Sequence, residues 1–460
     1  MPQEADDQNR EKKNGVKRAQ PSRGGISHTW RALRYRNFRL FFGGQSISLI
    51  GTWMTRVATS WLVYRLTDSA LLLGLVGFVG QLPTFLLAPF AGVWVDRLNR
   101  RHVLVWTQVL AAVQSLALAA LTLSRRVTIH EILLLSGFQG LINAFDMPAR
   151  QAFLVQMVED RRDLGNAIAI NSSMVNLARL VGPSLAGLLI AAFPAGSGEG
   201  YCFLLDGVSY FAVIASLLMM RVPPLDVPRV ASSMWEQLKE GWVYVSGFSP
   251  VRNLLLLFAL VSLMGMPYIV LMPVFASDVL HGGPHTLGFL MGAAGVGALV
   301  SALSLAARKT VLGLGKMVPI SAIIFGVSLI CLGLSKTAWL SMLMMLLTGF
   351  GMMQGMAASN TIIQTVVPED RRGRVMSYYT MAFVGMAPFG SLLAGGLAHW
   401  LGAPRTVMIT GSIVIAGGIW FATRLKMFRK LIRPIYEEKG ILPQRQPVIL
   451  EDAGSNSATL

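Results

Sequence analysis

Residues 70–101 read ALLLGLVGFVGQLPTFLLAPFAGVWVDRLNRR, an apolar run that ends in a basic link. The 26 residues of 70–95 contain no charged side chain. A run of about 20 apolar residues crosses the hydrocarbon core of a bilayer as one helix, and links rich in Arg and Lys stay on the cytoplasmic side. The stretch therefore predicts a membrane-spanning helix that exits into the cytoplasm.

The whole chain shares this composition. Of its 460 residues, 53% are apolar and 14% are charged, whereas a soluble domain carries about 25% charged residues. This excess of apolar surface must face membrane lipid, so we expect an all-α integral membrane protein, multi-pass in the cytoplasmic membrane of a bacterium. The net charge of +17 would suit nucleic acid, but most Lys and Arg lie in the tails and short links, so no nucleic-acid partner is expected.

Twelve apolar stretches are long enough to cross the bilayer. They form two groups of six: 40–64, 70–95, 102–124, 129–147, 166–192 and 201–220, then 252–277, 286–306, 317–335, 338–360, 375–398 and 406–423. With both termini in the cytoplasm, 33 of the 40 Lys and Arg residues fall on the cytoplasmic side. The opposite orientation would invert that ratio, so the sequence predicts an N-in, C-in topology.

The predicted spans divide the chain into five segments. Residues 1–39 form a basic cytoplasmic tail, predicted to be disordered and without a cleaved signal peptide. Residues 40–220 and 251–423 form the two six-helix bundles, 221–250 form a cytoplasmic connection, and 424–460 form a cytoplasmic tail.

The connection between the bundles contains a predicted amphipathic helix. Ser233–Glu236 has a helix-capping pattern, and one helical face carries Trp235, Leu238, Trp242 and Val245. We expect this helix to lie along the cytoplasmic interface between the halves. Whether it is only a linker or takes part in the mechanism stays open.

The two groups of six look like copies of one another. Glu159–Arg162, with the sequence EDRR, recurs 210 positions later as Glu369–Arg372. Gly182 and Pro183 are likewise echoed by Ala387 and Pro388. Parallel six-helix repeats place a substrate site between them near the middle of the membrane, reached from alternate sides as the halves rock.

The link from Gly92 to Arg101, GVWVDRLNRR, resembles the signature loop of the major facilitator superfamily, G-x-x-x-D-R-x-G-R-R/K. Asn99 replaces the second glycine, and asparagine tolerates a left-handed turn. The resemblance implies the twelve-helix, two-bundle fold of secondary transporters. In the latch that we predict, Asp96 meets the positive end of the eleventh span, while Arg97 and Arg101 seek nearby acids. A loop that only sets topology is the alternative.

The fifth span carries a second motif. Residues 178–187, ARLVGPSLAG, resemble the exporter motif of the superfamily, G-x-x-x-G-P-x-x-G-G, and the resemblance implies outward transport. Gly182 and Gly187 permit close helix approach, and Pro183 bends the span. Close packing alone remains an alternative. Arg179 either contacts an anionic substrate or donates to backbone carbonyls.

The fourth span has a polar stripe at helical spacing, formed by Gln139, Asn143, Asp146 and Arg150. The superfamily pattern R-x-x-Q-G appears here as SGFQG, without the arginine that is tied to proton coupling. DMPAR, residues 146–150, resembles the corresponding stretch of the enterobactin-exporter and macrolide-efflux branch. Asp146 therefore either serves the cavity or a gate, or it terminates the helix.

The first span also has a polar face, which includes Gln45, Thr52 and Arg56. An arginine at the centre of a lone span costs about 3 kcal/mol on insertion scales, so Arg56 should face the interior and find a partner. We expect Asp206 to be that partner, and the pair titrates during transport, anchors substrate or only joins two helices. In span ten, Met352 and Met356 either line a pliable cavity for varied apolar ligands or fill gaps.

Several kinds of site have no basis in the sequence. Its two cysteines, Cys202 and Cys331, indicate no disulfide framework or metal spacing, and no phosphate-binding loop and no nucleophile with a base occur. We expect no enzyme, cofactor or metal, but a monomeric secondary transporter that exports small amphipathic molecules, such as drugs, macrolides or siderophores, by using the proton gradient. The alternatives are an uptake or lipid-handling carrier of this fold, and a sensor or scaffold that does not transport.

Overall fold

The computed structural model describes residues 31–221, 234–308 and 310–443, and within these ranges all regular secondary structure is helical. The first half of the molecule comprises six long helices: α3 (Arg36–Thr67), α4 (Ala70–Arg97), α5 (Arg100–Leu123), α6 (Ile129–Gln156), α7 (Leu164–Ala192) and α8 (Ser197–Met219). Two short elements accompany them, η1 (Arg31–Arg34) and η2 (Arg161–Asp163).

The second half repeats this plan with more interruptions. Its helices are α10 (Ser249–Leu260), η3 (Val261–Gly265), α11 (Tyr268–Val274), η4 (Phe275–Val279), α12 (Pro284–Ala306), α13 (Leu314–Leu334), α14 (Ala338–Val366), α15 (Glu369–Val384), α16 (Ala387–Leu401) and α17 (Ala403–Thr423). The first four make one span, as do α15 and α16. Helix α9 (Met234–Gly247) precedes this half, and α18 (Leu425–Glu438) follows it.

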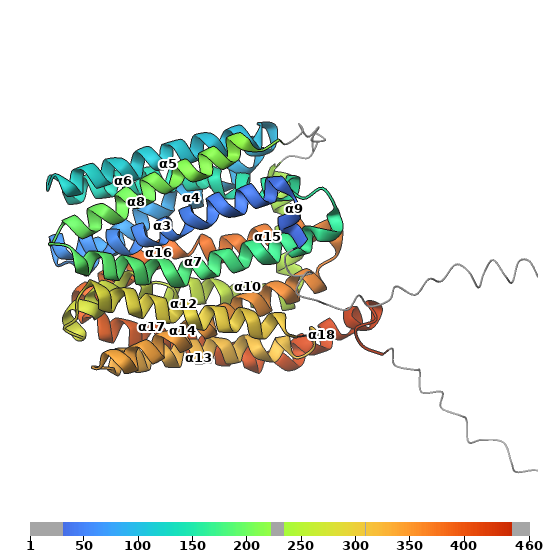
Figure 1. Cartoon of the computed structure of the whole chain (residues 1–460). Helices are drawn as coiled ribbons and strands as arrows, with labels where there is room; N and C mark the ends of the chain where they lie inside the picture. The colour runs from blue at the N-terminus through green and yellow to red at the C-terminus, as the bar shows by residue number, and fades with distance from the viewer. Residues whose placement is uncertain (1–30, 222–233, 309, 444–460) are drawn as a thin grey trace, which may run out of the picture.

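Each of the twelve predicted apolar stretches corresponds to one helix or to one such run of helices. Eleven of these, within the described residues, are long and apolar enough to cross a membrane. The exception is α3, which carries the polar face of the first predicted span. It nevertheless packs between α7 and α8 as a full-length member of the bundle (Figure 1).

The long helices run side by side, with α5, α6 and α8 of the first half at the top of Figure 1 and α12, α13, α14 and α17 of the second half at the bottom. Helices α9 and α18 lie at one end of the bundle, which we call the terminal end. The short turns that join α3 to α4, α5 to α6 and α7 to α8 lie at the other end, which we call the opposite end. Each half therefore begins and finishes at the terminal end.

Polar caps in the short links set where the helices begin. The Ser69 hydroxyl accepts a hydrogen bond from the backbone N–H of Leu72 at the start of α4. Asn99 Oδ1 accepts from the N–H groups of Arg101 and His102, at 3.1 and 3.4 Å, and caps α5. Asn99 has a φ of −68° and does not use the left-handed turn that asparagine tolerates. Its side chain is used as a helix cap.

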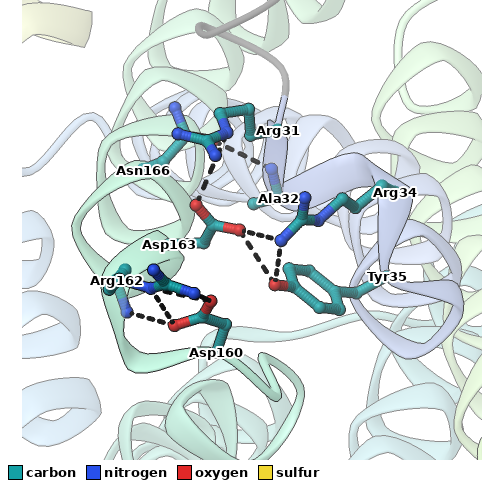
Figure 2. Close-up of polar contacts among 8 residues, drawn as sticks. All are labelled: Arg31, Ala32, Arg34, Tyr35, Asp160, Arg162, Asp163 and Asn166. Atoms are coloured by element: carbon teal, nitrogen blue, oxygen red, sulfur yellow. Dashed lines mark hydrogen bonds and ion pairs between the residues drawn. The ribbon is translucent and has the colours of Figure 1, made fainter. Parts of the chain in front are cut away.

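The chain is already ordered before residue 40. Helix α3 begins at Arg36, and η1 precedes it, so residues 31–39 differ from the predicted disordered tail, while residues 1–30 lie outside the described part. Figure 2 shows the reason: Arg34 and Tyr35 donate to Asp163 at 2.6 and 2.8 Å, and Arg31 lies 3.7 Å from the same carboxylate.

The helix predicted in the connection is α9, which packs on α10 and α15 of the second half. Glu240 forms an ion pair with Arg374, and the rings of Trp242 and Tyr378 lie 6.0 Å apart. Val245 is buried, whereas the side chains of Trp235 and Leu238 lie outside the described part. These contacts attach α9 to the second half.

Candidate functional site

Two pairs of glycines join the halves near the opposite end. Gly74 of α4 meets Gly395 of α16, and Gly187 of α7 meets Gly288 of α12. A methyl group added to Gly395 would lie 2.8 Å from Gly74 Cα, and one added to Gly288 would lie 2.9 Å from Gly187 Cα. Only glycine permits backbones to approach this closely. The predicted duplication of the halves is thus reflected in two equivalent glycine contacts, each of which joins one helix of the first half to one helix of the second.

One side-chain hydrogen bond reinforces this closure. The hydroxyl of Tyr64, near the end of α3, donates to Asp278 Oδ2 in η4. Because α3 and η4 belong to different halves, the bond must break whenever the halves separate at the opposite end.

The terminal end is packed differently. The last turns of α4 and the first turns of α7 and α15 contain Gly92, Gly165 and Gly373, and a methyl group on any of the three would meet no atom of the described residues within 4 Å. In the conformation described, the halves therefore touch tightly at the opposite end, and these helix ends are loosely surrounded at the terminal end.

The predicted latch has a different set of contacts. Arg101 donates through Nε to the carbonyl of Leu217 at 2.8 Å and through Nη2 to the carbonyl of Leu218 at 2.7 Å. It therefore caps the end of α8, and no acid among the described side chains forms an ion pair with it, contrary to the prediction. Arg97 is exposed, and the side chain of Asp96 lies outside the described part, so its place in a latch stays a prediction.

The middle of the first half holds a cationic group of side chains that we call the Trp53 centre: Trp53, Arg56 and Arg179. The guanidinium carbons of Arg56 and Arg179 lie 4.7 and 5.2 Å from the centroid of the Trp53 ring. Gly182 makes the arrangement possible, because a methyl group there would lie 2.5 Å from Trp53 Cβ. Part of the predicted exporter motif thus lets α7 approach α3.

The guanidinium group of Arg179 makes fewer hydrogen bonds than it has N–H donors. Its Nε and Nη1 atoms are buried and have no hydrogen-bond partner, so the alternative in which the side chain serves backbone carbonyls does not account for these two N–H groups. Its backbone carbonyl packs against Gly295 of α12, which places the residue at the junction of the two halves.

Asp206 lies deep in α8 and is 2% exposed. Its Oδ2 accepts from Thr55 at 2.8 Å and from Ser115 at 3.2 Å, whereas Oδ1 is buried without a partner. Among the described ion pairs, none within 4.0 Å joins Asp206 to Arg56. The predicted Arg56–Asp206 pair is therefore wrong for this conformation, and two hydroxyl groups take the place of the arginine.

Asp146 is another buried carboxylate. Its Oδ1 accepts from Thr107 at 3.0 Å and from Gln108 at 2.8 Å, and its Oδ2 pairs with Arg150. Helix α6 continues past Pro148 to Gln156, so the alternative that Asp146 terminates the helix is wrong. The polar stripe joins α6 to α5.

The remaining predicted residues lie on the same helices as expected. Gln139 donates to Asn143 at 3.3 Å, Thr52 donates to a carbonyl of its own helix at 3.0 Å, and Gln45 is buried. In the second half, Met352 and Met356 border a small cavity between α10, α13 and α14. They are about 300 positions from Trp53 in the chain and lie on α14, a helix of the other half.

Three features were missed at the sequence level. Trp53 stands three positions before Arg56, a spacing that puts two side chains on one helical face, so the pattern could have indicated it. Asp163 and the pair Tyr64–Asp278 had no such signal, because their partners come from helices distant in sequence.

Residues 27–433 match the sequence profile of the transmembrane secretion effector family. The staphyloferrin A transporter of Staphylococcus aureus is 26% identical over 389 residues, covering 84% of this chain and 96% of that protein. The multidrug efflux pump Tap of Mycolicibacterium fortuitum is 27% identical over 371 residues, covering 78% and 88%. Macrolide efflux protein A of Streptococcus pyogenes is 22% identical over 397 residues, covering 83% and 95%.

The fold also matches solved transporters. A bacterial homolog of the human lysosomal transporter Spinster, in an inward-facing and unoccupied conformation, superposes with a TM-score of 0.67. The match covers 89% of this chain and 99% of that one at 14% identity. The nucleoside transporter NupG gives 0.65 at 12% identity. Identities this low establish the fold alone.

Proposed function

The chain belongs to the transmembrane secretion effector family of the major facilitator superfamily, and we propose that it exports small amphipathic organic molecules by alternating access. It is a multi-pass membrane transporter and not an enzyme. The observation that carries the proposal is the doubled glycine contact, Gly74–Gly395 and Gly187–Gly288, which closes one end around a polar centre. Two related halves that close on one side of a central site are what alternating access requires.

We propose that the terminal end faces the cytoplasm. The exposed basic side chains support this, because Arg97 and the basic residues of α18 lie at that end, where positive charge is retained during insertion. The conformation described is then open to the cytoplasm, ready to load a substrate for export. The relatives named as efflux pumps support the same direction.

We further propose that the proton gradient drives export, with Asp206 as the proton-carrying group. A carboxylate buried in the middle of a span is expensive and is usually functional. One of its oxygens has no partner, so a proton could be accepted there without breaking the bonds to Thr55 and Ser115. No resident cofactor or metal is needed in this scheme.

The scheme is tested by transport into inside-out membrane vesicles, with a panel of fluorescent amphipathic compounds and with or without a protonophore. We expect ATP-independent accumulation that the protonophore abolishes and that Asp206→Asn makes insensitive to the imposed proton gradient. Accumulation that ignores the protonophore would overturn proton coupling. Accumulation only in right-side-out vesicles would instead support an uptake carrier, and none in either would support a non-transporting protein.

We expect a monomer, because the described glycine contacts and the Trp53 centre lie within one chain. Light scattering of the purified protein, corrected for detergent, tests this. Loss of transport on Asp96→Asn in a normally folded protein would support the predicted latch.

A further inference from the structure

The Trp53 centre contains two positive charges near the middle of the membrane. Arg56 and Arg179 each lie in the middle third of their helices, and both guanidinium groups lie over the same indole. Among the described ion pairs, no carboxylate oxygen lies within 4.0 Å of either. Two like charges are thus held together without a direct counter-ion.

Such an arrangement is unfavourable in an empty protein. The Nε and Nη1 atoms of Arg179 are buried, and removing an ion from water carries a free-energy penalty that an opposite charge normally offsets. A cation–π contact offsets only part of such a penalty, and here one ring is shared by both arginines. The Nε and Nη1 atoms of Arg179 have no hydrogen-bond partner, so hydrogen bonds do not offset the rest of the desolvation penalty.

The closest acid does not neutralise the centre. Asp206 accepts its hydrogen bonds from Thr55 and Ser115, and no ion pair joins it to an arginine. If Asp206 is ionised, two positive charges and one negative charge leave a net charge of +1. If it is protonated, the net charge is +2. An anion is attracted in both states.

The Trp53 centre is not completely buried. The side chain of Arg56 is exposed although it lies in the middle third of a bundle helix, and Arg179 is partly exposed at the junction with α12. The opposite end is closed by the two glycine contacts. Because the opposite end is closed, a ligand for the exposed arginine would enter from the terminal end.

We propose that the Trp53 centre binds the carboxylate of an amphipathic organic acid, so that this transporter moves anions in preference to cationic drugs. The inference rests on the proposed function and names its substrate class. The guanidinium groups of Arg56 and Arg179 donate to the carboxylate, and Trp53 holds them in place. The apolar part of the acid lies toward the second half, whose spans carry no mid-span charge in the described residues.

The test is equilibrium binding to the purified full-length protein in lipid nanodiscs, measured by calorimetry. The probes are 1-naphthaleneacetate, its uncharged carboxamide and the corresponding 2-(1-naphthyl)ethylammonium ion, which share one apolar group and differ in charge. We expect the acid to bind at least about tenfold more tightly than the amide, because hydrogen bonds between charged partners are stronger than those to a neutral group. Arg179→Gln and Arg56→Gln should each reduce that ratio toward one.

Matched variants separate recognition from folding. Arg179→Lys keeps the charge and should keep part of the preference for the acid. Arg126→Gln removes the same charge from the exposed turn between α5 and α6 and should leave the ratio unchanged. Monodisperse elution of each variant in size-exclusion chromatography verifies that it is folded.

The outcomes distinguish this inference from the proposed function. If the acid binds no more tightly than the amide, or if no probe binds, the substrate class is refuted. If the ammonium ion binds best, the substrate is a cation. In both cases export in the vesicle assay can still succeed, and then the proposed function stands. Failure of that assay with every compound refutes the function separately.

Discussion

Replacing Gly395 by alanine should push the transporter out of the conformation described here. The added methyl group would lie 2.8 Å from the carbonyl oxygen of Ala70, 2.8 Å from Gly74 Cα and 3.1 Å from Gly74 N. All three are backbone atoms, so no side chain can turn aside, and α16 must move away from α4. Overpacking of this kind costs about 1–3 kcal/mol.

The penalty applies to one state only. The contact between α4 and α16 exists when the opposite end is closed, and it is relieved when the halves separate there. A difference of about 1–3 kcal/mol between two states changes their ratio about 5- to 150-fold. Because alternative conformations of such proteins differ by only a few kcal/mol, the state open at the opposite end should become well populated.

Double electron–electron resonance between two spin labels measures this change in population as a change in the distance distribution. Arg126→Cys and Lys336→Cys place the labels on exposed turns of the two halves at the opposite end, and Cys331→Ala removes the more accessible native thiol. Gly395→Ala should add a population at longer distance, and Gly288→Ala should do the same through the other contact. Gly396→Ala is the matched control, because its methyl group would meet no atom within 4 Å. Identical distance distributions for Gly395→Ala and Gly396→Ala would refute the reasoning.

Three further predictions concern polar contacts. Tyr64→Phe removes the hydrogen bond to Asp278, so the same spin-label pair should report more of the longer distance, and an unchanged distribution would contradict the assigned role. Asp163→Asn should speed tryptic cleavage within residues 31–36, because the carboxylate that holds Arg34 loses its charge, whereas Asp160→Asn should not. The side-chain hydrogen bond from Arg162 lowers the pKa of Asp160 from 3.8 to about 2. A lowered pKa stabilises this loop above pH 3.8, and the contribution is lost as the pH falls toward 2. The hydrogen-exchange protection of the Arg162 amide should fall in that window, and protection lost already at pH 5 would contradict the assignment.

The spans could be predicted from the sequence because their signal is local. Length and apolar content decide whether a segment crosses a bilayer, and residues such as Ser69 and Asn99 mark where the next helix begins. The duplication was also visible, since EDRR recurs at residues 159–162 and 369–372. These features need no knowledge of which helices are neighbours.

Predicting side-chain partners requires knowing which helices are neighbours and how each is rotated, and here the prediction from the sequence was wrong. Arg56 was paired with Asp206 on grounds of depth alone. Successive residues on an α-helix are rotated by about 100°. Thr55 therefore faces α8 and donates to Asp206, while Arg56, one position later, turns toward Trp53. Depth in the membrane constrains a pairing, but the rotation of each helix decides it.

The duplication and the polar centre lead to a contrast between the halves. The two halves contribute equally to the glycine contacts, since each half supplies one helix to each contact. The charged residues in the middle thirds of the described membrane spans are distributed unequally: Arg56, Asp146, Arg179 and Asp206 all belong to the first half. Closure therefore depends on both halves equally, while charge recognition depends on one. It follows that alanine at Gly288 or Gly395 should disturb the conformational equilibrium similarly, whereas selectivity for substrate charge should respond to substitutions in the first half alone.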